Sequence, residues 1–361
     1  ITFLGGMLFT LLHVPLSWML GPMSAVLLWT SVTRRRLVWP MWLRNGGLIL
    51  LGYSMGLSFT LESAKQIYTQ LPYMFVATLL TVVFSILTAF PTSRQAGVSL
   101  ASGVIGSIPG GLSQMVVLSD EIEGADAAVV AFMQTLRLLL VVFVIPFTAV
   151  HGLAQGIVGG GAGNPVRGTT DMWGSLLGWA EALASRPPVS FLLVAGVAGA
   201  CWIAAKLRFP TPYFLGPIIA AAAFTVFGTE PPRLPSLFVL MAQWSLGIYI
   251  GVGIKLSSLK NWRRLLPYTV VGNIALIGFT LGLSYVFSLA LPMSMLTAFL
   301  GMSPGGMAEM SVTAALVGAD VSLVVAYQLF RILFILLIVP YMLRWGFKYF
   351  KRKADVTQGH M

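Results

Sequence analysis

One short motif occurs twice in this chain, each time inside an apolar stretch. The first copy is Gly106-Ser-Ile-Pro-Gly-Gly-Leu-Ser-Gln-Met115, and the second is Gly301-Met-Ser-Pro-Gly-Gly-Met-Ala-Glu-Met310. Proline removes a backbone donor and glycine loosens the chain, so we expect each copy to interrupt a helix. Irregular backbone survives at membrane depth only where protein or a water-filled cavity satisfies its polar groups. Two interrupted segments at matching places in two halves are typical of a transport site.

Composition predicts a polytopic, all-α integral membrane protein with the lipid bilayer as its main partner. Of its 361 residues, 57% are hydrophobic and 9% are charged, whereas about a quarter are charged in a soluble domain. The net charge of +11 lies partly in clusters between apolar runs, such as Arg34 to Arg36 and Lys348 to Lys353. Such clusters are typical of cytoplasmic loops. We expect no nucleic-acid partner, because no folded part outside the apolar runs presents a basic face.

The two motif copies belong to an internal duplication. An offset of 195 residues places Leu20-Gly21-Pro22 on Leu215-Gly216-Pro217, and a shift of one residue then places Gly124-Ala125-Asp126 on Gly318-Ala319-Asp320. We expect each Leu-Gly-Pro motif to form a tight turn that leads into a short helix. The match predicts four parts: membrane repeat 1 (1–150), a polar, glycine-rich linker (151–188), membrane repeat 2 (189–345) and a basic cytoplasmic tail (346–361). We expect a short amphipathic helix in the linker, around Met172 to Leu183.

The distribution of lysine and arginine favours inverted repeats. If the interrupted segment is re-entrant, each repeat crosses the membrane five times and repeat 2 is inverted; outside the tail, eleven basic residues are then cytoplasmic and four external. If the segment crosses, the repeats are parallel and the split is eight to seven. The positive-inside rule favours the first arrangement. We therefore expect about ten crossings, both termini in the cytoplasm and an external linker.

The interruptions themselves are candidate binding sites. In repeat 1 we expect half-helices over 95–107 and 109–122. If Pro109 begins the second half-helix, the free N–H groups of Gly110, Gly111 and Leu112 attract an anion. The equivalent residues of repeat 2 are Pro304, Gly305 and Gly306. The alternative is a proline-kinked helix with tight glycine packing.

An arginine lies in the middle of the last apolar segment of each repeat, as Arg137 and Arg331. An arginine at the bilayer centre costs about 2.5–3.5 kcal/mol, so both should face the protein interior. Gln134 and Gln328 lie on the same helix faces as these arginines. Two roles remain open: the arginines bind an anionic substrate, or they donate to unwound carbonyls of the interrupted helices. Asp126 and Asp320 are expected to begin the last helix of each repeat.

Glu309 is a carboxylate inside an apolar run, and its counterpart in repeat 1 is Gln114. It is a candidate ion-coupling residue; the alternative is an ion pair with Arg331. No catalytic residue, metal ligand or cofactor is predicted. The predicted substrate site comprises Gly106, Pro109, Gly110, Gly111, Gln114, Gln134, Arg137, Gly301, Ser303, Pro304, Gly305, Gly306, Gln328 and Arg331.

The paired Leu-Gly-Pro motifs, the Pro-Gly-Gly interruptions and the Gly-Ala-Asp…Gln…Arg segments together resemble the AbrB family of duplicated bacterial membrane proteins. This family is often labelled ammonia monooxygenase and is unrelated to the small DNA-binding regulator of the same name. The resemblance implies a bacterial inner-membrane location and a link to regulation of a DNA-alkylation response gene. It implies no established substrate. The oxygenase label disagrees with the residues, because copper and iron oxygenases need clustered ligands, whereas this chain has three scattered histidines and one cysteine.

The leading hypothesis is therefore secondary transport. We expect a small-molecule solute, with an anion as the leading candidate, to pass through a midplane site between the repeats. The alternative is a membrane sensor that changes gene expression through a partner without transport. An enzyme is not expected, and a homodimer is compatible with the sequence.

Overall fold

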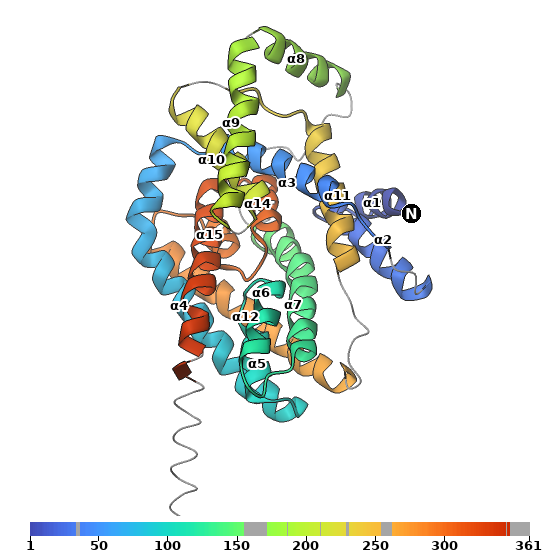
Figure 1. Ribbon diagram of the computed structural model, residues 1–361, viewed down its shortest axis with the longest axis vertical. Coiled ribbons are helices and arrows are strands. Elements are labelled where there is room, and N and C mark those ends of the chain that lie inside the picture. The colour runs from blue at the N-terminus through green and yellow to red at the C-terminus, as the bar shows by residue number, and fades with distance from the viewer. Residues whose placement is uncertain are drawn as a thin grey trace, which may run out of the picture.

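The computed structural model describes residues 1–33, 37–154, 172–185, 187–209, 211–228, 231–253, 262–343 and 345–346. The expectations for Arg34 to Arg36, for the glycine-rich part of the linker and for the basic tail from Lys348 lie outside these residues. The described part of the chain is helical and contains no strand (Figure 1).

The helices of the first half recur in the same order in the second half. The first half contains α1 (Thr2–Leu11), α2 (Ser17–Thr33), α3 (Met41–Gly56), α4 (Leu61–Ala96), α5 (Leu100–Ser107), α6 (Leu112–Glu121), α7 (Ala127–Phe147) and the π-helical η1 (Thr148–Leu153). After α8 (Met172–Ser185), where the short linker helix is predicted, follow α9 (Pro187–Lys206), α10 (Pro212–Val226), α11 (Ser236–Gly253), α12 (Trp262–Ala290), α13 (Met295–Met302), α14 (Met307–Val317) and α15 (Val321–Leu337).

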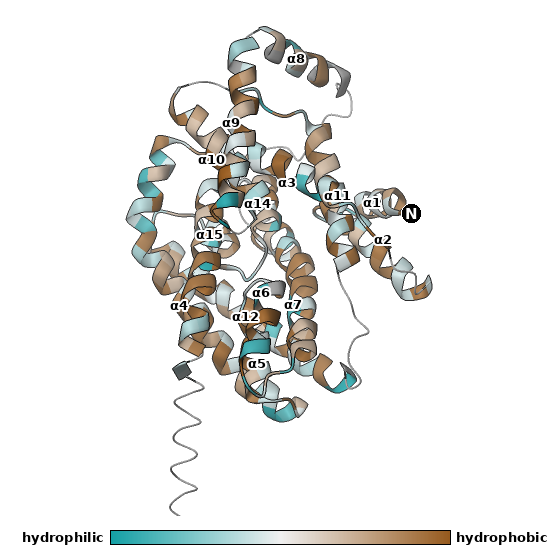
Figure 2. Ribbon diagram, in the orientation of Figure 1, coloured by the Kyte–Doolittle hydropathy of each residue, from teal (hydrophilic) through white to brown (hydrophobic). Residues whose placement is uncertain are grey.

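Four stretches of the described chain are long and apolar enough to cross a bilayer: Leu61–Ala96, Ala127–Leu153, Ser236–Gly253 and Arg263–Ala290. Shorter apolar helices, α14 and α15 among them, pack between and around these. Hydrophobic residues dominate the helices in Figure 2, whereas hydrophilic residues gather where α4 ends and α12 begins. The chain is thus an all-α protein built to be embedded in a membrane.

The two halves interlock through their third helices. A Cβ atom added at Gly52 of α3 would collide with the carbonyl oxygen of Phe214 in α10. In the same way, a Cβ atom at Gly247 of α11 would collide with the carbonyl oxygen of Met19 in α2. Glycine is required at both positions because the two backbones approach so closely. Each half therefore packs its third helix on the second helix of the other half.

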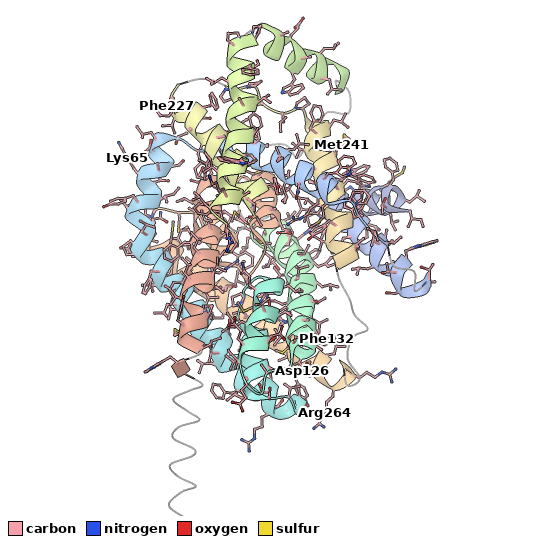
Figure 3. The ribbon with its side chains drawn as sticks, in the orientation of Figure 1. Lys65, Asp126, Phe132, Phe227, Met241 and Arg264 are labelled. Carbon is pink, nitrogen blue, oxygen red and sulfur yellow. The ribbon has the colours of Figure 1, made fainter. Side chains whose placement is uncertain are left out.

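Corresponding helices of the two halves run in opposite directions (Figure 1). In that view α4 descends and α12 rises, and α7 rises while α15 descends. Lys65, near the start of α4, and Arg264, near the start of α12, consequently lie at opposite ends of the molecule (Figure 3). A Cβ atom at Gly97, just after α4, would lie 3.9 Å from the guanidinium of Arg264. The end of α4 and the start of α12 thus meet at one end.

One sequence expectation about the second helices is wrong. We expected Leu20-Gly21-Pro22 and its copy to form tight turns, but Gly21 and Pro22 lie inside α2. The turn comes earlier, at His13 and Leu16, whose φ angles are 53° and 52°. The corresponding residues Arg208 and Thr211 have φ angles of 55° and 46°. Gly21 instead allows α2 to pack closely on Gly5 of α1.

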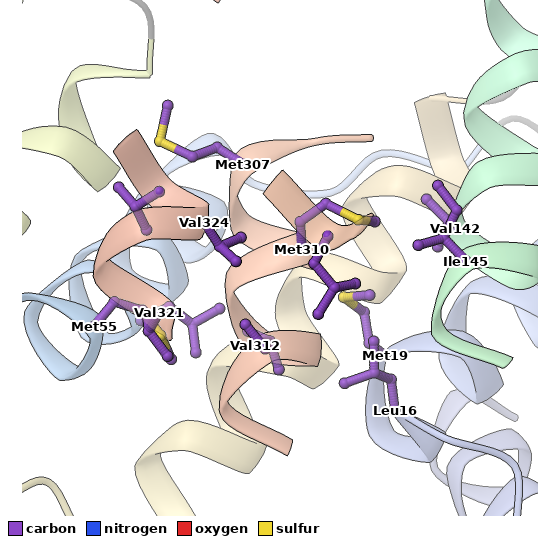
Figure 4. Close-up of a cluster of buried hydrophobic side chains, with 14 of the residues drawn as sticks. Leu16, Met19, Met55, Val142, Ile145, Met307, Met310, Val312, Val321 and Val324 are labelled. Atoms are coloured by element: carbon purple, nitrogen blue, oxygen red, sulfur yellow. The ribbon is translucent and has the colours of Figure 1, made fainter. Parts of the chain in front are cut away.

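The core is divided so that each last helix packs on the interrupted segment of the other half. Val142 and Ile145 of α7 lie in one cluster with Phe299 of α13 and Met310 of α14, and Figure 4 shows Met310 beside them. A second cluster reverses the roles: it joins Ile335, near the end of α15, to α5 and α6. Both interrupted segments are therefore held by packing from both halves.

Candidate functional site

The first interruption separates α5 from α6 by an extended segment. Ser99 caps α5 by accepting from the backbone N–H of Ser102 at 3.2 Å, and the helix ends at Ser107. Ile108 and Gly111 are extended, with ψ angles of 131° and 135°. The short helix therefore spans residues 100–107 rather than the predicted 95–107, since α4 continues through Ala96 and ends at Gly97, whose φ is +70°.

The expectation that Pro109 begins the second half-helix is also wrong. The residue that caps α6 is Gly111, and the first helical residue is Leu112. The N–H of Gly110 is not free, because it donates to the carbonyl of Ile108 at 2.8 Å. In the second half Gly306 caps α14, and Gly305 donates to Ser303, also at 2.8 Å. The free N–H groups thus begin at the second glycine of each pair, not at the first.

Side chains of α7 satisfy the carbonyl groups of the first interruption. The amide nitrogen of Gln134 donates to the carbonyl of Ile108 at 2.9 Å and to those of Ile105 and Gly106 at 3.1 and 3.2 Å. The guanidinium of Arg137 donates to the carbonyls of Ile108 and Gly110, at 2.7 and 2.8 Å. Gln134 and Arg137 are 1% and 7% exposed, so these bonds form away from solvent.

The second interruption is held in the same way by α15. Gln328 donates to the carbonyls of Leu300 and Ser303, at 2.7 and 3.0 Å. Arg331 donates to the carbonyls of Ser303 and Gly305, the latter at 2.7 Å. One difference separates the halves: Arg331 also donates to the side-chain oxygen of Gln328 at 2.6 Å, whereas the equivalent oxygen of Gln134 has no hydrogen-bond partner.

Of the two roles that the sequence leaves open for the arginines, the structure shows donation to unwound carbonyls. It also shows unused capacity, because the Nε atoms of both Arg137 and Arg331 are buried without a hydrogen-bond partner. Arginine has five N–H donors and no acceptor. Each buried guanidinium can therefore donate one more hydrogen bond, to an acceptor such as an anion or a water oxygen.

Glu309 and Gln114 occupy equivalent places at the starts of the second half-helices. Glu309 lies in the first turn of α14, and a Cβ atom at Gly306 would lie 2.7 Å from its carboxyl carbon. Likewise, a Cβ atom at Gly111 would lie 3.1 Å from the side-chain oxygen of Gln114. A carboxylate is favoured at a helix N-terminus. One half-helix thus carries an ionisable carboxyl group at its start, while the other carries a neutral amide.

The alternative role for Glu309 was an ion pair with Arg331. The described partners of the Arg331 guanidinium are instead the carbonyls of Met302, Ser303 and Gly305 and the side chain of Gln328. In the described part of the chain, no ion pair joins Glu309 to Arg331. The carboxyl group is therefore placed by its own half-helix rather than by the arginine.

Asp126 and Asp320 begin the last helices, as predicted. Asp126 accepts from the N–H of Ala128 at 2.8 Å, and Asp320 from that of Leu323 at 3.1 Å. The backbone N–H of each aspartate also donates to the preceding short helix: Asp126 to Ser102 at 2.7 Å and Asp320 to Thr297 at 3.0 Å. These bonds fix the start of α7 and α15 against α5 and α13.

The remaining predicted site residues pack against neighbouring helices and do not extend towards a substrate space. A Cβ atom at Gly106 would meet the side chain of Met133, and one at Gly301 that of Tyr327. Ser303 is completely buried, and its hydroxyl donates to the carbonyl of Phe299. The prolines Pro109 and Pro304 lie between the carbonyls that the arginines satisfy.

Sequence reasoning missed a small cavity beside the first interruption. Its walls come from four helices and contain Thr88, Thr92, Gly106, Ser107, Met133, Thr269, Gly272, Asn273 and Leu276. Only Gly106 among these belongs to the predicted site. A comparison of the two repeats position by position contains the signal, because the hydroxyl-bearing Thr88 and Thr92 correspond to Leu283 and Phe287.

Fold and site together define a class: all-α membrane proteins with two interrupted helices, each braced by a buried arginine and glutamine. The chain belongs to the AbrB family, whose family model, described as "Transition state regulatory protein AbrB", matches residues 18–346. The chain is 28% identical over 355 residues to "Putative regulator AbrB" of Escherichia coli (strain K12), covering 96% of this chain and 94% of that relative. It is 25% identical over 355 residues to "Uncharacterized protein YhjN" of Bacillus subtilis (strain 168), covering 93% and 88%.

Proposed function

We propose that this protein is a secondary transporter of the bacterial inner membrane, built from two inverted repeats, that moves a small anionic solute. One observation carries the proposal: Arg137 and Arg331, equivalent residues of the two halves, each keep a buried Nε–H group without a partner beside an interrupted helix. A buried donor of this kind calls for an acceptor. The N-terminal ends of α6 and α14 add partial positive charge next to the same interruptions.

The opposite directions of corresponding helices support the inverted arrangement. So does the position of Arg264 close to Gly97, because inversion requires the end of α4 and the start of α12 to share the cytoplasmic side. Lys65, which inversion places outside, lies at the other end of the molecule (Figure 3). Inversion brings the two interruptions to the same depth, where they can share one site.

Glu309 supplies the asymmetry that coupling requires. Its carboxylate lies against the N-terminal end of α14, whereas the equivalent end of α6 has the neutral Gln114. An anionic solute is therefore repelled from α14 while Glu309 is ionised and is favoured at α6. Protonation of Glu309 removes that repulsion, so proton binding and solute movement become linked.

Reconstituted protein tests this function directly. Proteoliposomes are loaded with buffer and exposed to radiolabelled acetate, lactate, succinate or benzoate as N-methyl-D-glucamine salts, with and without an inward proton gradient. We expect proton-driven accumulation of at least one of these anions above protein-free liposomes. If none of the four enters or stabilises the purified protein against heat, the transport proposal is wrong.

The second candidate is a membrane regulator without transport, and the name of the Escherichia coli relative, "Putative regulator AbrB", favours it. A strain lacking the gene separates the two readings. If the expression changes follow from proton-driven transport, we expect Glu309→Gln, which should lose proton-driven accumulation, to leave them uncorrected. Full correction by Glu309→Gln favours the regulator. In neither reading do we propose an enzymatic activity or a cofactor, and a homodimer stays a prediction.

A further inference from the structure

The cavity beside the first interruption is enclosed by α4, α5, α7 and α12. Its empty volume is about 260 Å³, but only about 10 Å³ of this admits the centre of a water molecule. A cavity needs roughly 10–15 Å³ by that measure to hold one water. The space therefore suits a single species of about the size of one water molecule.

The threonine hydroxyl groups in the walls of the cavity offer acceptors rather than donors. The hydroxyl of Thr92 donates to the carbonyl of Thr88 at 2.8 Å, and that of Thr88 to Ser85 at 2.9 Å. On α12, the hydroxyl of Thr269 donates to Leu265 at 2.9 Å, and the amide of Asn273 donates to Thr269 at 2.8 Å. The hydroxyl protons of these three threonines are thereby used within their own helices, so lone pairs are what their hydroxyl groups have left, whereas the hydroxyl of Ser107 can donate or accept.

The end of α5 adds negative partial charge at the same place. Gly106 and Ser107 line the cavity and are the last two residues of that helix. The C-terminal end of a helix favours a cation. Gln134 already donates to the carbonyls of Ile105 and Gly106 here, so the carbonyl of Ser107 is the group that this end offers to a cation. In discontinuous membrane helices, such ends and hydroxyl or carbonyl oxygens bind monovalent ions.

At the corresponding place in the second half, apolar residues replace five of the residues that line the cavity. The positions equivalent to Thr88, Thr92 and Ser107 are Leu283, Phe287 and Met302, and those equivalent to Thr269 and Gly272 are Met74 and Ala77. All five of these counterparts lie together in or against one hydrophobic cluster with Tyr327. The remaining polar side chain of the α12 wall, Asn273, corresponds to Thr78, which is also buried. The duplication has thus replaced most, but not all, of the polar lining of the cavity by apolar side chains in the second half.

We propose that this cavity is a binding site for one small, dehydrated monovalent cation of the size of Na⁺. Neutral oxygens and a helix C-terminus suit a monovalent ion, whereas Mg²⁺ and Ca²⁺ require carboxylates or retain water. The site is separate from Glu309, which lies at the other interruption, and it does not depend on whether the protein transports an anion.

Two glycines of α12 provide a matched pair of variants. A Cβ atom at Gly272 would lie 3.5 Å from the hydroxyl oxygen of Thr92, which is ordinary contact, so Gly272→Ala fills the cavity without a clash. Gly278 has no atom within 4 Å of an added Cβ, so Gly278→Ala leaves the cavity unchanged. A second pair is Thr92→Val and Thr81→Val: both threonines are buried and donate within α4, but only Thr92 lines the cavity.

The measurement is thermal unfolding of the purified full chain in chloride solutions of Na⁺, K⁺ or N-methyl-D-glucamine at constant ionic strength. A ligand that binds only the folded state raises the unfolding midpoint. We expect Na⁺ to raise it in the wild type, in Gly278→Ala and in Thr81→Val. The apparent Na⁺ affinity should fall at least about tenfold in Gly272→Ala and Thr92→Val, as expected when one ligand or the space itself is lost.

Two outcomes overturn the inference. If Na⁺ and N-methyl-D-glucamine give the same midpoint in the wild type, the cavity holds water alone. If Na⁺ stabilises the wild type and all four variants equally, the ion binds elsewhere. Neither outcome bears on the anion experiment, whose salts contain no Na⁺, so failure of the two proposals can be distinguished.

Discussion

Arg137 and Arg331 donate to carbonyl groups that a continuous helix would satisfy by itself. The carbonyl of Ile108 accepts from both Gln134 and Arg137, whereas that of Gly110 accepts from Arg137. An unpaired carbonyl at this depth costs about as much as a lost buried hydrogen bond. The arginines are therefore structural parts of the interruptions and, through their free Nε–H groups, candidate ligands as well.

Replacing these arginines should destabilise the protein. For Arg137→Ala we expect a loss of about 1–3 kcal/mol or more, since the carbonyl of Gly110 is left without its partner. Arg331→Ala should behave alike. Lysine should rescue poorly, because an ammonium group lacks the planar fork that reaches two carbonyls at once. Unfolding midpoints in detergent give the comparison, with the exposed Arg233→Ala as control. Equal midpoints for all three alanine variants would show that Arg137 and Arg331 do not stabilise the interrupted helices.

Glu309→Gln makes the two half-helix starts chemically alike, because the counterpart is already Gln114. We expect the fold to survive, because the amide side chain of Gln114 already occupies the equivalent place beside Gly111. Proton-driven accumulation of the anion should be lost while anion exchange at zero gradient continues. Retention of proton-driven accumulation would remove Glu309 from the mechanism.

At the scale of elements, the close crossings of α3 with α10 and of α11 with α2 join the halves. Gly52→Ala should cost about 1–3 kcal/mol, because the added methyl group meets a backbone oxygen that cannot move aside. Gly46→Ala, in the same helix, is the control: no atom lies within 4 Å of the added Cβ, so we expect no loss and a gain of up to about 1 kcal/mol from helix propensity. Equal loss of stability in both variants would show that the crossing is not tight.

Several elements could be predicted from sequence because their signals are local. Asp126 and Asp320 precede apolar helices after a glycine, and each caps the helix that follows. Membrane depth, together with the helical spacing of Gln134 and Arg137, indicated a buried polar face, and both residues are buried. The helical fold and its membrane character follow from composition in the same way.

Other features depend on partners that are distant in sequence. The start of α6 at Leu112 rather than at Pro109 reflects extended backbone held by α7, which no local rule foresees. The placement of Gly21 inside α2 depends on packing against α1. The cavity combines threonines of α4 with residues of α12, and neither set forms a motif by itself. Only the departure from the repeat at these positions marks it.

At the scale of the whole molecule, contacts between the halves occur in reciprocal pairs. The third helix of each half packs on the second helix of the other, and the last helix of each packs on the interrupted segment of the other. Such reciprocity is what a twofold axis between equivalent halves produces. Two departures from it, at Glu309 and at the cavity, lie where we propose that a solute or an ion acts.

The central claim is that the two halves traverse the membrane in opposite directions, and labelling of single cysteines tests it most directly. Cys201 is the chain's single cysteine, so Lys65→Cys and Arg264→Cys are made in a Cys201→Ser background and treated in intact cells with an impermeant thiol reagent. Inverted halves predict labelling at position 65 and none at position 264 until the cells are opened. Labelling at position 264 in intact cells would show parallel halves and contradict the account.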